Sequence, residues 1–368
     1  MAASRGELLG LTADELGALM VDWGEKPYHG RQLYGALYRR RQLDTRSMTE
    51  LSKSLRRKLA SCTITLPRLK KRQRAGDGTD KYLLELTDKA KIECVLIPER
   101  KRTTLCISTQ AGCPLDCRFC LTAMLGFRRN LNPAEILGQV LYVLADRNLA
   151  INSAGDGSRP ALTNLVLMGM GEPLLNLDNV LKSLIILADP GGLALSPRRI
   201  TLSTVGLVPQ MRRLARAPVV PNLAVSLSAT TDEVRDRLMP INRRYPIDTI
   251  LQACADYPLK RNQRVTFEYV LMDGVNDSDD DARRLVKLLA HLRSKVNLLP
   301  LNPGNANGLR PSSPRRVNRF REILTGKGLP AYVRRPRGMD IYAACGQLHL
   351  AADHSSRTTR TSRLDTNS

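Results

Sequence analysis

The stretch Gly112-Cys-Pro-Leu-Asp-Cys-Arg-Phe-Cys-Leu121 carries three cysteines, Cys113, Cys117 and Cys120, in the spacing Cys-x3-Cys-x2-Cys. Three thiolates on one short loop can bind three irons of a [4Fe–4S] cluster and leave the fourth iron without a protein ligand. Electron-transfer clusters are usually held by four cysteines, so this loop indicates an iron kept open for a substrate or cofactor. A structural zinc site is the alternative, but it usually needs a second cysteine pair or paired histidines, and neither lies near the loop in the sequence.

The composition points to a polyanionic partner. Among 368 residues, 57 Lys and Arg face 35 Asp and Glu, which gives a formal charge of +22. Such a surplus favours binding to phosphate groups but does not separate RNA from DNA or from an acidic membrane surface. No segment approaches the roughly twenty apolar residues that span a bilayer, and the N-terminus lacks the apolar run of a signal peptide. Eight cysteines without such a peptide indicate a reducing compartment, so we expect a cytoplasmic protein with no membrane contact.

Four regions follow one another along the chain. Residues 1–65 predict a small helical domain whose basic faces favour RNA contact, although simple solvation would explain any single face. Residues 66–109 predict short β-strands in a hairpin-like arrangement. In residues 110–350 strands and helices alternate, with about six strands after the cysteine loop, fewer than the eight of a closed barrel. We therefore expect an α/β fold, an open, partial barrel, followed by a disordered basic tail at 351–368.

A second motif, Gly169-Met-Gly-Glu-Pro173, follows an apolar strand. It lacks the third glycine of a dinucleotide-binding loop and has a proline where the helix would begin. We interpret it instead as a strand-end loop in which Glu172 receives the ammonium group of a ligand. Two further cysteines, Cys106 before the loop and Cys345 near the end of the barrel, would each be read alone as a buried apolar residue.

Together these segments resemble the radical S-adenosylmethionine (SAM) adenine methyltransferases of 23S rRNA. That family methylates carbon 2 of an adenosine in the peptidyl-transferase centre, and some members also act on tRNA next to the anticodon. The resemblance extends from Leu11 to Leu348 and rests on ordered matches that include IECVLIPE, TLCISTQAGCPLDCRFC, LMGMGEPLLNL, YVLMDGVND and RGMDIYAACGQL. It implies a [4Fe–4S] cluster and SAM as cofactors, a flavodoxin-like reductant and 23S rRNA as partners. With no unexplained apolar stripe, we expect a monomer.

The resemblance also implies a role for each site residue. Cys113, Cys117 and Cys120 would bind the cluster. Cys345 would receive a methyl group from one SAM, and a radical made from a second SAM would activate that methyl for addition to the adenine ring. Cys106 would then release the product by forming a disulfide with Cys345, and Glu93 would accept the proton. A radical route fits because carbon 2 of adenine is not nucleophilic. The residues implied to hold SAM are Gly171, Glu172, Ser203, Ser226, Leu227, Ser228 and Asn302.

Two positions leave alternatives open. Residue 228 is a serine where the family usually has a histidine, and Glu93 could be a solvated carboxylate on an edge strand. The competing functions are methylation of carbon 8, which confers resistance to ribosome-targeting antibiotics, and RNA binding by a paralogue that no longer methylates. A zinc-stabilised nucleic-acid-binding protein is a further alternative.

Overall fold

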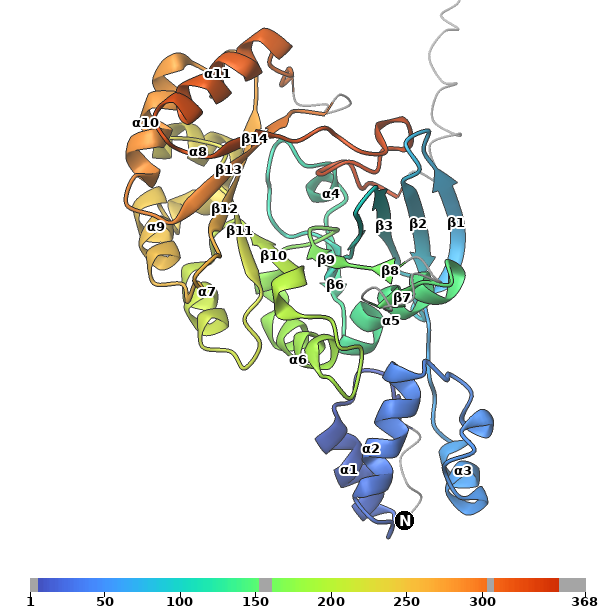
Figure 1. The fold of residues 1–368 in the computed structure, drawn as a ribbon. Helices are drawn as coiled ribbons and strands as arrows, with labels where there is room; N and C mark the ends of the chain where they lie inside the picture. The colour runs from blue at the N-terminus through green and yellow to red at the C-terminus, as the bar shows by residue number, and fades with distance from the viewer. Residues whose placement is uncertain (1–5, 152–160, 303–307, 351–368) are drawn as a thin grey trace, which may run out of the picture.

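The computed structural model describes residues 6–151, 161–302 and 308–350, and its first helices project from the main body (Figure 1). Thr12 begins the first helix with a capping box, in which its side chain and that of Glu15 each accept the other's backbone N–H. A Cβ on Gly30 would lie 2.3 Å from the backbone of Gly17, so two glycines let the first two helices pack closely. The elements are α1 (Ala13–Asp22), α2 (Tyr28–Tyr34), a π-helix (Gly35–Arg39), a 3-10 turn (Thr45–Ser47) and α3 (Lys53–Leu59).

One ten-stranded sheet forms the core of the molecule, in the order β1-β2-β3-β4-β9-β10-β11-β12-β13-β14. Its first four strands are antiparallel, and β4 pairs in parallel with β9, so the predicted hairpin region is continuous with the barrel. These strands are β1 (Arg68–Arg74), β2 (Asp80–Glu85), β3 (Lys91–Glu99) and β4 (Arg102–Cys106).

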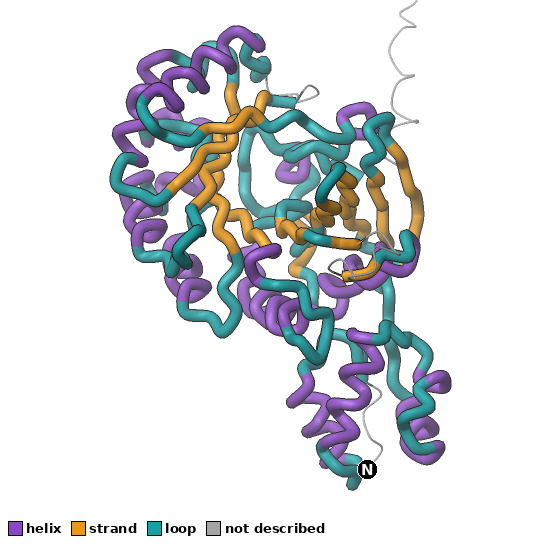
Figure 2. Tube along the Cα trace, in the orientation of Figure 1, coloured by secondary structure: helices purple, strands orange, loops and turns teal. Residues whose placement is uncertain are grey.

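The parallel half of the sheet curves inside a layer of helices (Figure 2). The predicted open α/β barrel and its six strands after the cysteine loop are thereby confirmed. The strands are β9 (Asn164–Leu167), β10 (Ile200–Thr204), β11 (Asn222–Ser226), β12 (Val265–Leu271), β13 (Ser294–Pro300) and β14 (Ala331–Val333). The helices are α5 (Pro133–Asp146), α6 (Leu177–Ala188), α7 (Val208–Ala215), α8 (Asp232–Leu238), α9 (Ile247–Ala255), α10 (Asp279–Leu289) and α11 (Pro314–Gly326).

A small hairpin encloses the cysteine loop. It consists of β5 (Gln110–Gly112) and β6 (Phe127–Asn130), with the short helix α4 (Leu121–Met124) between them. Gly112 has a φ of +80°, and a Cβ there would lie 1.9 Å from the carbonyl oxygen of Gly126. That carbonyl accepts the backbone N–H of Cys113 at 3.0 Å, so a glycine at 112 is needed to close the loop.

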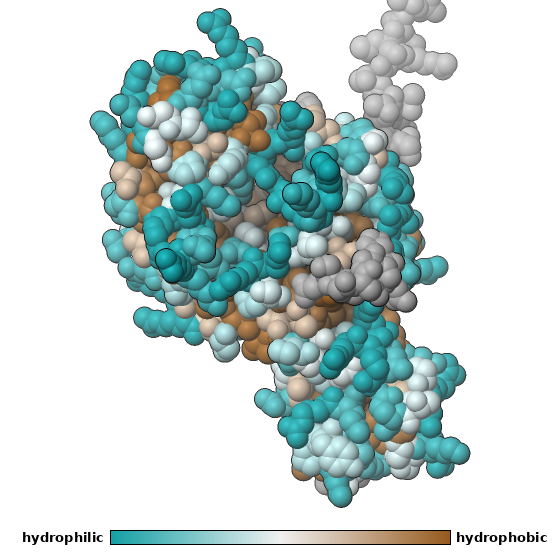
Figure 3. All heavy atoms as spheres, in the orientation of Figure 1, coloured by the Kyte–Doolittle hydropathy of each residue, from teal (hydrophilic) through white to brown (hydrophobic). Residues whose placement is uncertain are grey.

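The remaining short elements connect the barrel. They are a second small sheet of β7 (Ala150–Ile151) and β8 (Ala161–Leu162), and 3-10 turns at Pro173–Asn176, Pro197–Arg199, Pro240–Arg243 and Met339–Ile341. Within the described ranges, the helices are too short or too polar to cross a bilayer. Hydrophilic side chains cover most of the face in Figure 3, with apolar residues in its recesses. The tail predicted to be disordered, 351–368, lies outside the described residues.

Candidate active site

The three cysteines of the loop line one cavity of about 180 Å³, which we call the inner cavity. Burial raises the pKa of Cys113 to about 12 and that of Cys117 well above its usual range, so both thiols are protonated at neutral pH without a metal. Iron binding would release those protons, as metal binding to cysteine does in general. The backbone N–H of Cys120 donates to the carbonyl of Cys117 at 3.0 Å, which keeps the loop tight.

The strand ends of the barrel supply the other wall of the inner cavity. Five of the residues predicted to hold SAM line it: Gly171, Glu172, Ser203, Ser226 and Asn302. They come from the loop after β9, from β10, from the last residue of β11 and from the segment after β13. The sheet therefore brings together residues separated by more than a hundred positions.

Glu172 is fixed in this wall by three hydrogen bonds. Its carboxylate accepts the backbone N–H of Leu174 at 3.1 Å and that of Val205 at 3.0 Å, and its own N–H donates to the side chain of Gln110 at 2.8 Å. Burial raises the pKa of Glu172 to about 7. A buried carboxylate without a cation beside it is suited to receive an ammonium group, because a charge partner offsets its desolvation.

Leu227 and Ser228 do not line the inner cavity. Leu227 is fully buried, and Ser228 is buried with a φ of +51°. The Ser228 hydroxyl accepts the backbone N–H of Val270 at 3.3 Å, and its carbonyl accepts a bond from the Asn276 amide at 2.7 Å. The contacts of Leu227 and Ser228 with SAM stay predictions.

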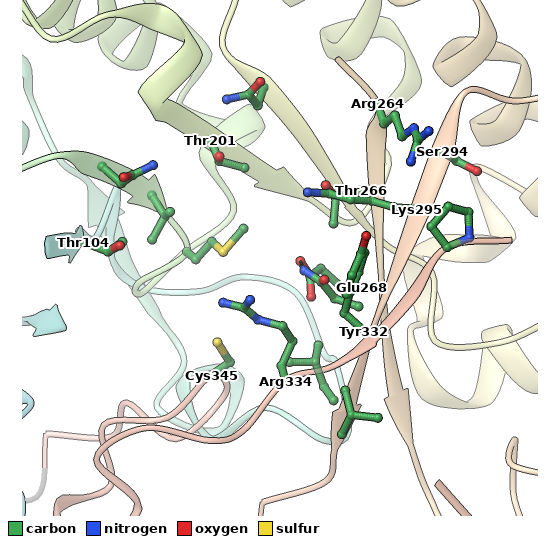
Figure 4. Close-up of a pocket in the computed structure, with 18 of the residues that line it drawn as sticks. Thr104, Thr201, Arg264, Thr266, Glu268, Ser294, Lys295, Tyr332, Arg334 and Cys345 are labelled. Carbon is green, nitrogen blue, oxygen red and sulfur yellow. Dashed lines mark hydrogen bonds between the residues drawn. The ribbon is translucent and has the colours of Figure 1, made fainter. Parts of the chain in front are cut away.

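Cys345 lines the inner cavity and also a second, larger cavity, which we call the basic groove. This basic groove, of about 1580 Å³, is lined by both Cys345 and Cys106. Cys345 is accessible to solvent, yet the groove walls enclose it and raise its pKa to about 11. Burial and the charge of Cys345 raise the pKa of Cys106, so the two thiols interact electrostatically. Figure 4 shows Arg334 extending between Cys345 and Glu268, a half-buried carboxylate on β12 that sequence analysis did not single out.

Glu93 lies on β3, which is paired on both sides, and it is 1% exposed. The alternative that it is a solvated edge-strand carboxylate is therefore wrong. Its carboxylate forms an ion pair with Lys81 at 3.2 Å and accepts the backbone N–H of His349 at 3.0 Å. The Lys81 ammonium also donates to the carbonyl of Tyr342 at 3.2 Å. The pair thus holds both ends of the segment that carries Cys345.

Sequence analysis missed Lys81. Its signal is the strand register: β2 and β3 pair Leu83 with Glu93, so Lys81 is a diagonal neighbour of Glu93 on the same face. That register depends on the turn between the strands, and it becomes visible only once the sheet is known.

Comparison with known proteins identifies the family. A model of the Radical SAM superfamily matches residues 107–286, and a model of the ribosomal RNA large subunit methyltransferase N-terminal domain matches residues 6–64. A protein of Syntrophobacter fumaroxidans named dual-specificity RNA methyltransferase RlmN is 48% identical over 338 residues, which cover 92% of this chain and 96% of that protein. The chain belongs to the RlmN family.

Other relatives agree with this assignment. A protein of the same name from Desulfosudis oleivorans is 50% identical over 343 residues, covering 91% of this chain and 89% of that protein. The crystal structure of a radical SAM methyltransferase from Sphaerobacter thermophilus matches with a TM-score of 0.85 and 44% identity, over 94% of this chain and 99% of that one. Enzymes of the RlmN family use a [4Fe–4S] cluster and SAM.

The inner cavity fits these two cofactors. Across the described ranges, no three His, Cys, Asp or Glu side chains are close enough to share a single metal ion. A [4Fe–4S] cluster spreads its cysteine ligands over separate irons, so the three thiols need not converge on one point. The buried side-chain oxygen of Asn302 has no hydrogen-bond partner and stands in the wall where SAM would bind. An orphaned acceptor of this kind is typical of a ligand site.

Proposed function

We propose that this enzyme methylates carbon 2 of an adenosine in 23S rRNA and in tRNA next to the anticodon, with Cys345 as the carrier of the methyl group. One observation supports the carrier role above all: Cys345 lines both the inner cavity, with the cluster cysteines, and the basic groove, with Cys106. A single side chain can therefore face a methyl donor on one side and a bound RNA base on the other. The dual-specificity name of the relatives supports the two substrates.

The chain's own residues account for binding and release. Cys113, Cys117 and Cys120 would hold the cluster, and Glu172 would bind the ammonium group of SAM. When bound, the cluster and SAM supply the one-electron chemistry that an electron-poor ring carbon requires. Cys106 would give up its thiol proton and attack the sulfur of Cys345, forming the S–S bond while the bond from sulfur to the transferred carbon breaks. The electron pair of that bond stays with the carbon, which takes up one proton to become the methyl group.

Glu93 is our candidate proton acceptor. It lines neither cavity, and its carboxylate is occupied by Lys81 and by the backbone N–H groups of His349 and Leu350. We therefore propose that Glu93 accepts the proton after the segment that carries Cys345 has shifted and freed one oxygen of the Glu93 carboxylate.

The basic groove suits an RNA strand. Several of its lining cations form no ion pair within the described part of the chain, which leaves their charges available for phosphate groups. They are Arg198, Arg261, Arg264, Arg293, Lys295, Lys327, Arg334 and Arg335. We further propose that the helical domain at 1–65 contacts the RNA, and that the enzyme is a cytoplasmic monomer served by a flavodoxin-like reductant. The eight free thiols support a reducing compartment.

The test is anaerobic turnover of the reconstituted enzyme with SAM, a low-potential reductant and a 23S rRNA fragment or tRNA. Nucleosides are then compared with 2-methyladenosine and 8-methyladenosine by mass spectrometry. We expect 2-methyladenosine from both RNAs. An 8-methyladenosine product would assign the chain to the resistance enzymes. If no methylation occurs although the cluster and SAM are bound, the non-methylating paralogue is favoured, and Ser228 is the first residue to test as the cause.

Two variants test the carrier role. Cys345→Ala should bind SAM and RNA without forming methylated adenosine, and Cys106→Ala should stall with RNA attached through Cys345. Cys62→Ala, at a half-buried cysteine that lines neither cavity, is the matched control and should turn over normally. Normal turnover by Cys106→Ala would contradict release by disulfide formation.

A further inference from the structure

Arg235, on helix α8, is fully buried directly behind the inner cavity. Its guanidinium donates to the backbone carbonyls of Val205 at 2.6 Å, Ser226 at 3.0 Å and Leu227 at 3.1 Å. Val205 follows the end of β10 and Ser226 ends β11, and both line the inner cavity. One side chain thus joins two neighbouring strand ends at the place where SAM would bind.

The charge of Arg235 has no contacting counter-charge. Its fourth acceptor is the side-chain oxygen of Asn242 at 2.8 Å, so all four partners are neutral. Arg235 forms no ion pair with any described carboxylate. The charges of Asp232 and Asp236 act on it at longer range, and both accept hydrogen bonds from the Asn242 amide, at 2.9 and 2.8 Å. Burial lowers the pKa of Arg235 to about 10, which leaves it charged at neutral pH. A buried cation of this kind is costly unless an anion lies near it.

The cluster loop lies close to this cation. Cys117 lines the same inner cavity as Val205 and Ser226, whose carbonyls accept hydrogen bonds from Arg235. The backbone also connects the two elements, because the N–H of Arg118 donates at 3.0 Å to the carbonyl of Leu238, the last residue of α8. Three thiolates give a bound cluster a net negative charge, so Arg235 would face an anion once the cluster is present.

We propose that Arg235 is a positioning residue with two separable effects on this site: its hydrogen bonds fix the ends of β10 and β11 for SAM, and its charge raises the reduction potential of the cluster. The second effect follows because adding an electron makes the cluster more negative, and a nearby buried cation stabilises that state. The inference rests on the cofactor site of the proposed function but not on which RNA atom is methylated.

Two substitutions separate the effects. Arg235→Lys keeps the positive charge but has one nitrogen in place of the fork that reaches three carbonyls. Arg235→Met removes both charge and hydrogen bonds. Arg237→Met is the matched control, because Arg237 is an exposed arginine on the same helix. Each variant of the full chain is reconstituted anaerobically, and its cluster potential is measured by titration with a low-potential one-electron reductant monitored by electron paramagnetic resonance.

SAM affinity is measured by equilibrium dialysis without RNA. We expect Arg235→Lys to weaken SAM binding about tenfold, which corresponds to losing one charge-assisted hydrogen bond, and to keep the wild-type potential. Arg235→Met should also shift the potential to more negative values, and Arg237→Met should change neither quantity. A folded Arg235→Met with unchanged potential would overturn the charge effect.

If Arg235→Met does not fold, Arg235→Lys decides alone. Wild-type SAM affinity in that variant would overturn the inference, and weakened SAM binding at wild-type potential would support it. These measurements contain no RNA, so a failure of the proposed methylation does not alter them. An unexpected methylated carbon would likewise leave the role of Arg235 intact.

Discussion

Substituting Gly112 by alanine should prevent the cluster from assembling, whereas the same change at Gly126 should not. The two glycines form a matched pair, because both have a positive φ, +80° and +73°. An alanine in that conformation costs about 1–2 kcal/mol at either site. They differ in surroundings: a Cβ at 112 would lie 1.9 Å from the carbonyl oxygen of Gly126, and a Cβ at 126 would have nothing within 4 Å.

The clash between a Cβ at residue 112 and the Gly126 carbonyl determines how much iron the Gly112→Ala variant loses. The oxygen it meets belongs to the backbone and would have to move by about 1 Å or more to reach even a tight contact distance. That same carbonyl accepts the N–H of Cys113, so the shift displaces the first of the three cysteines that we propose bind the cluster. We therefore expect Gly112→Ala to lose most of its iron, and Gly126→Ala to keep it with unfolding free energy lowered by about 1–2 kcal/mol.

The assay is anaerobic reconstitution followed by measurement of iron and sulfide per chain, with visible absorption of the cluster as a second readout. Urea denaturation of the metal-free proteins gives the loss in stability. Equal iron contents in the two variants would show that the clash at residue 112 does not disturb the loop, because the φ cost is common to both variants and only the clash differs.

Three further predictions use other contacts. Lys81→Met leaves the buried carboxylate of Glu93 without its cation, so the unfolding free energy should fall by about 3–5 kcal/mol in urea denaturation, and a loss below about 1 kcal/mol would contradict a tight pair. Hydrogen bonds from Arg129 hold the pKa of Asp88 below its usual 3.8. The stability that these bonds contribute is therefore present above pH 3.8 and is lost as the pH falls below that value. Asp88→Asn should weaken this dependence of the unfolding free energy on acid pH, measured by denaturation at a series of pH values. Glu172→Gln should weaken SAM binding at least about tenfold by equilibrium dialysis with iron content unchanged, and wild-type affinity would exclude an ammonium contact.

What the sequence predicts well is local. The cysteine spacing lies within eight residues, so the loop could be proposed as a cluster site from sequence alone. The alternation of strands and helices is visible in short windows, so the partial barrel could be anticipated. Within the helical domain predicted at 1–65, α2 continues from Gly35 as a π-helix, which the local spacing does not reveal.

What the sequence leaves open depends on distant pairing. The contact of β4 with β9 joins segments about sixty residues apart, and no local pattern specifies it. The pairing of Lys81 with Glu93 needs the strand register, and the placement of Cys106 and Cys345 on one groove needs the whole sheet. Family resemblance predicted that Cys106 pairs with Cys345, and that pairing stays a prediction. Neither resemblance nor pattern pointed to Arg235, three of whose four partners are backbone carbonyls that any sequence would supply.

The continuity of β4 with β9 bears on how the enzyme can be divided. The region matched by the Radical SAM model starts at residue 107, so a fragment cut there would retain all three cysteines of the loop and lose β1 to β4. β9 would then become an edge strand with unpaired backbone groups, which is a template for aggregation. The same cut would remove Cys106 and Glu93. The smallest working unit of this enzyme therefore includes the antiparallel strands, which give the barrel a protected edge and carry Cys106 and Glu93, the residues that we propose for product release and proton transfer.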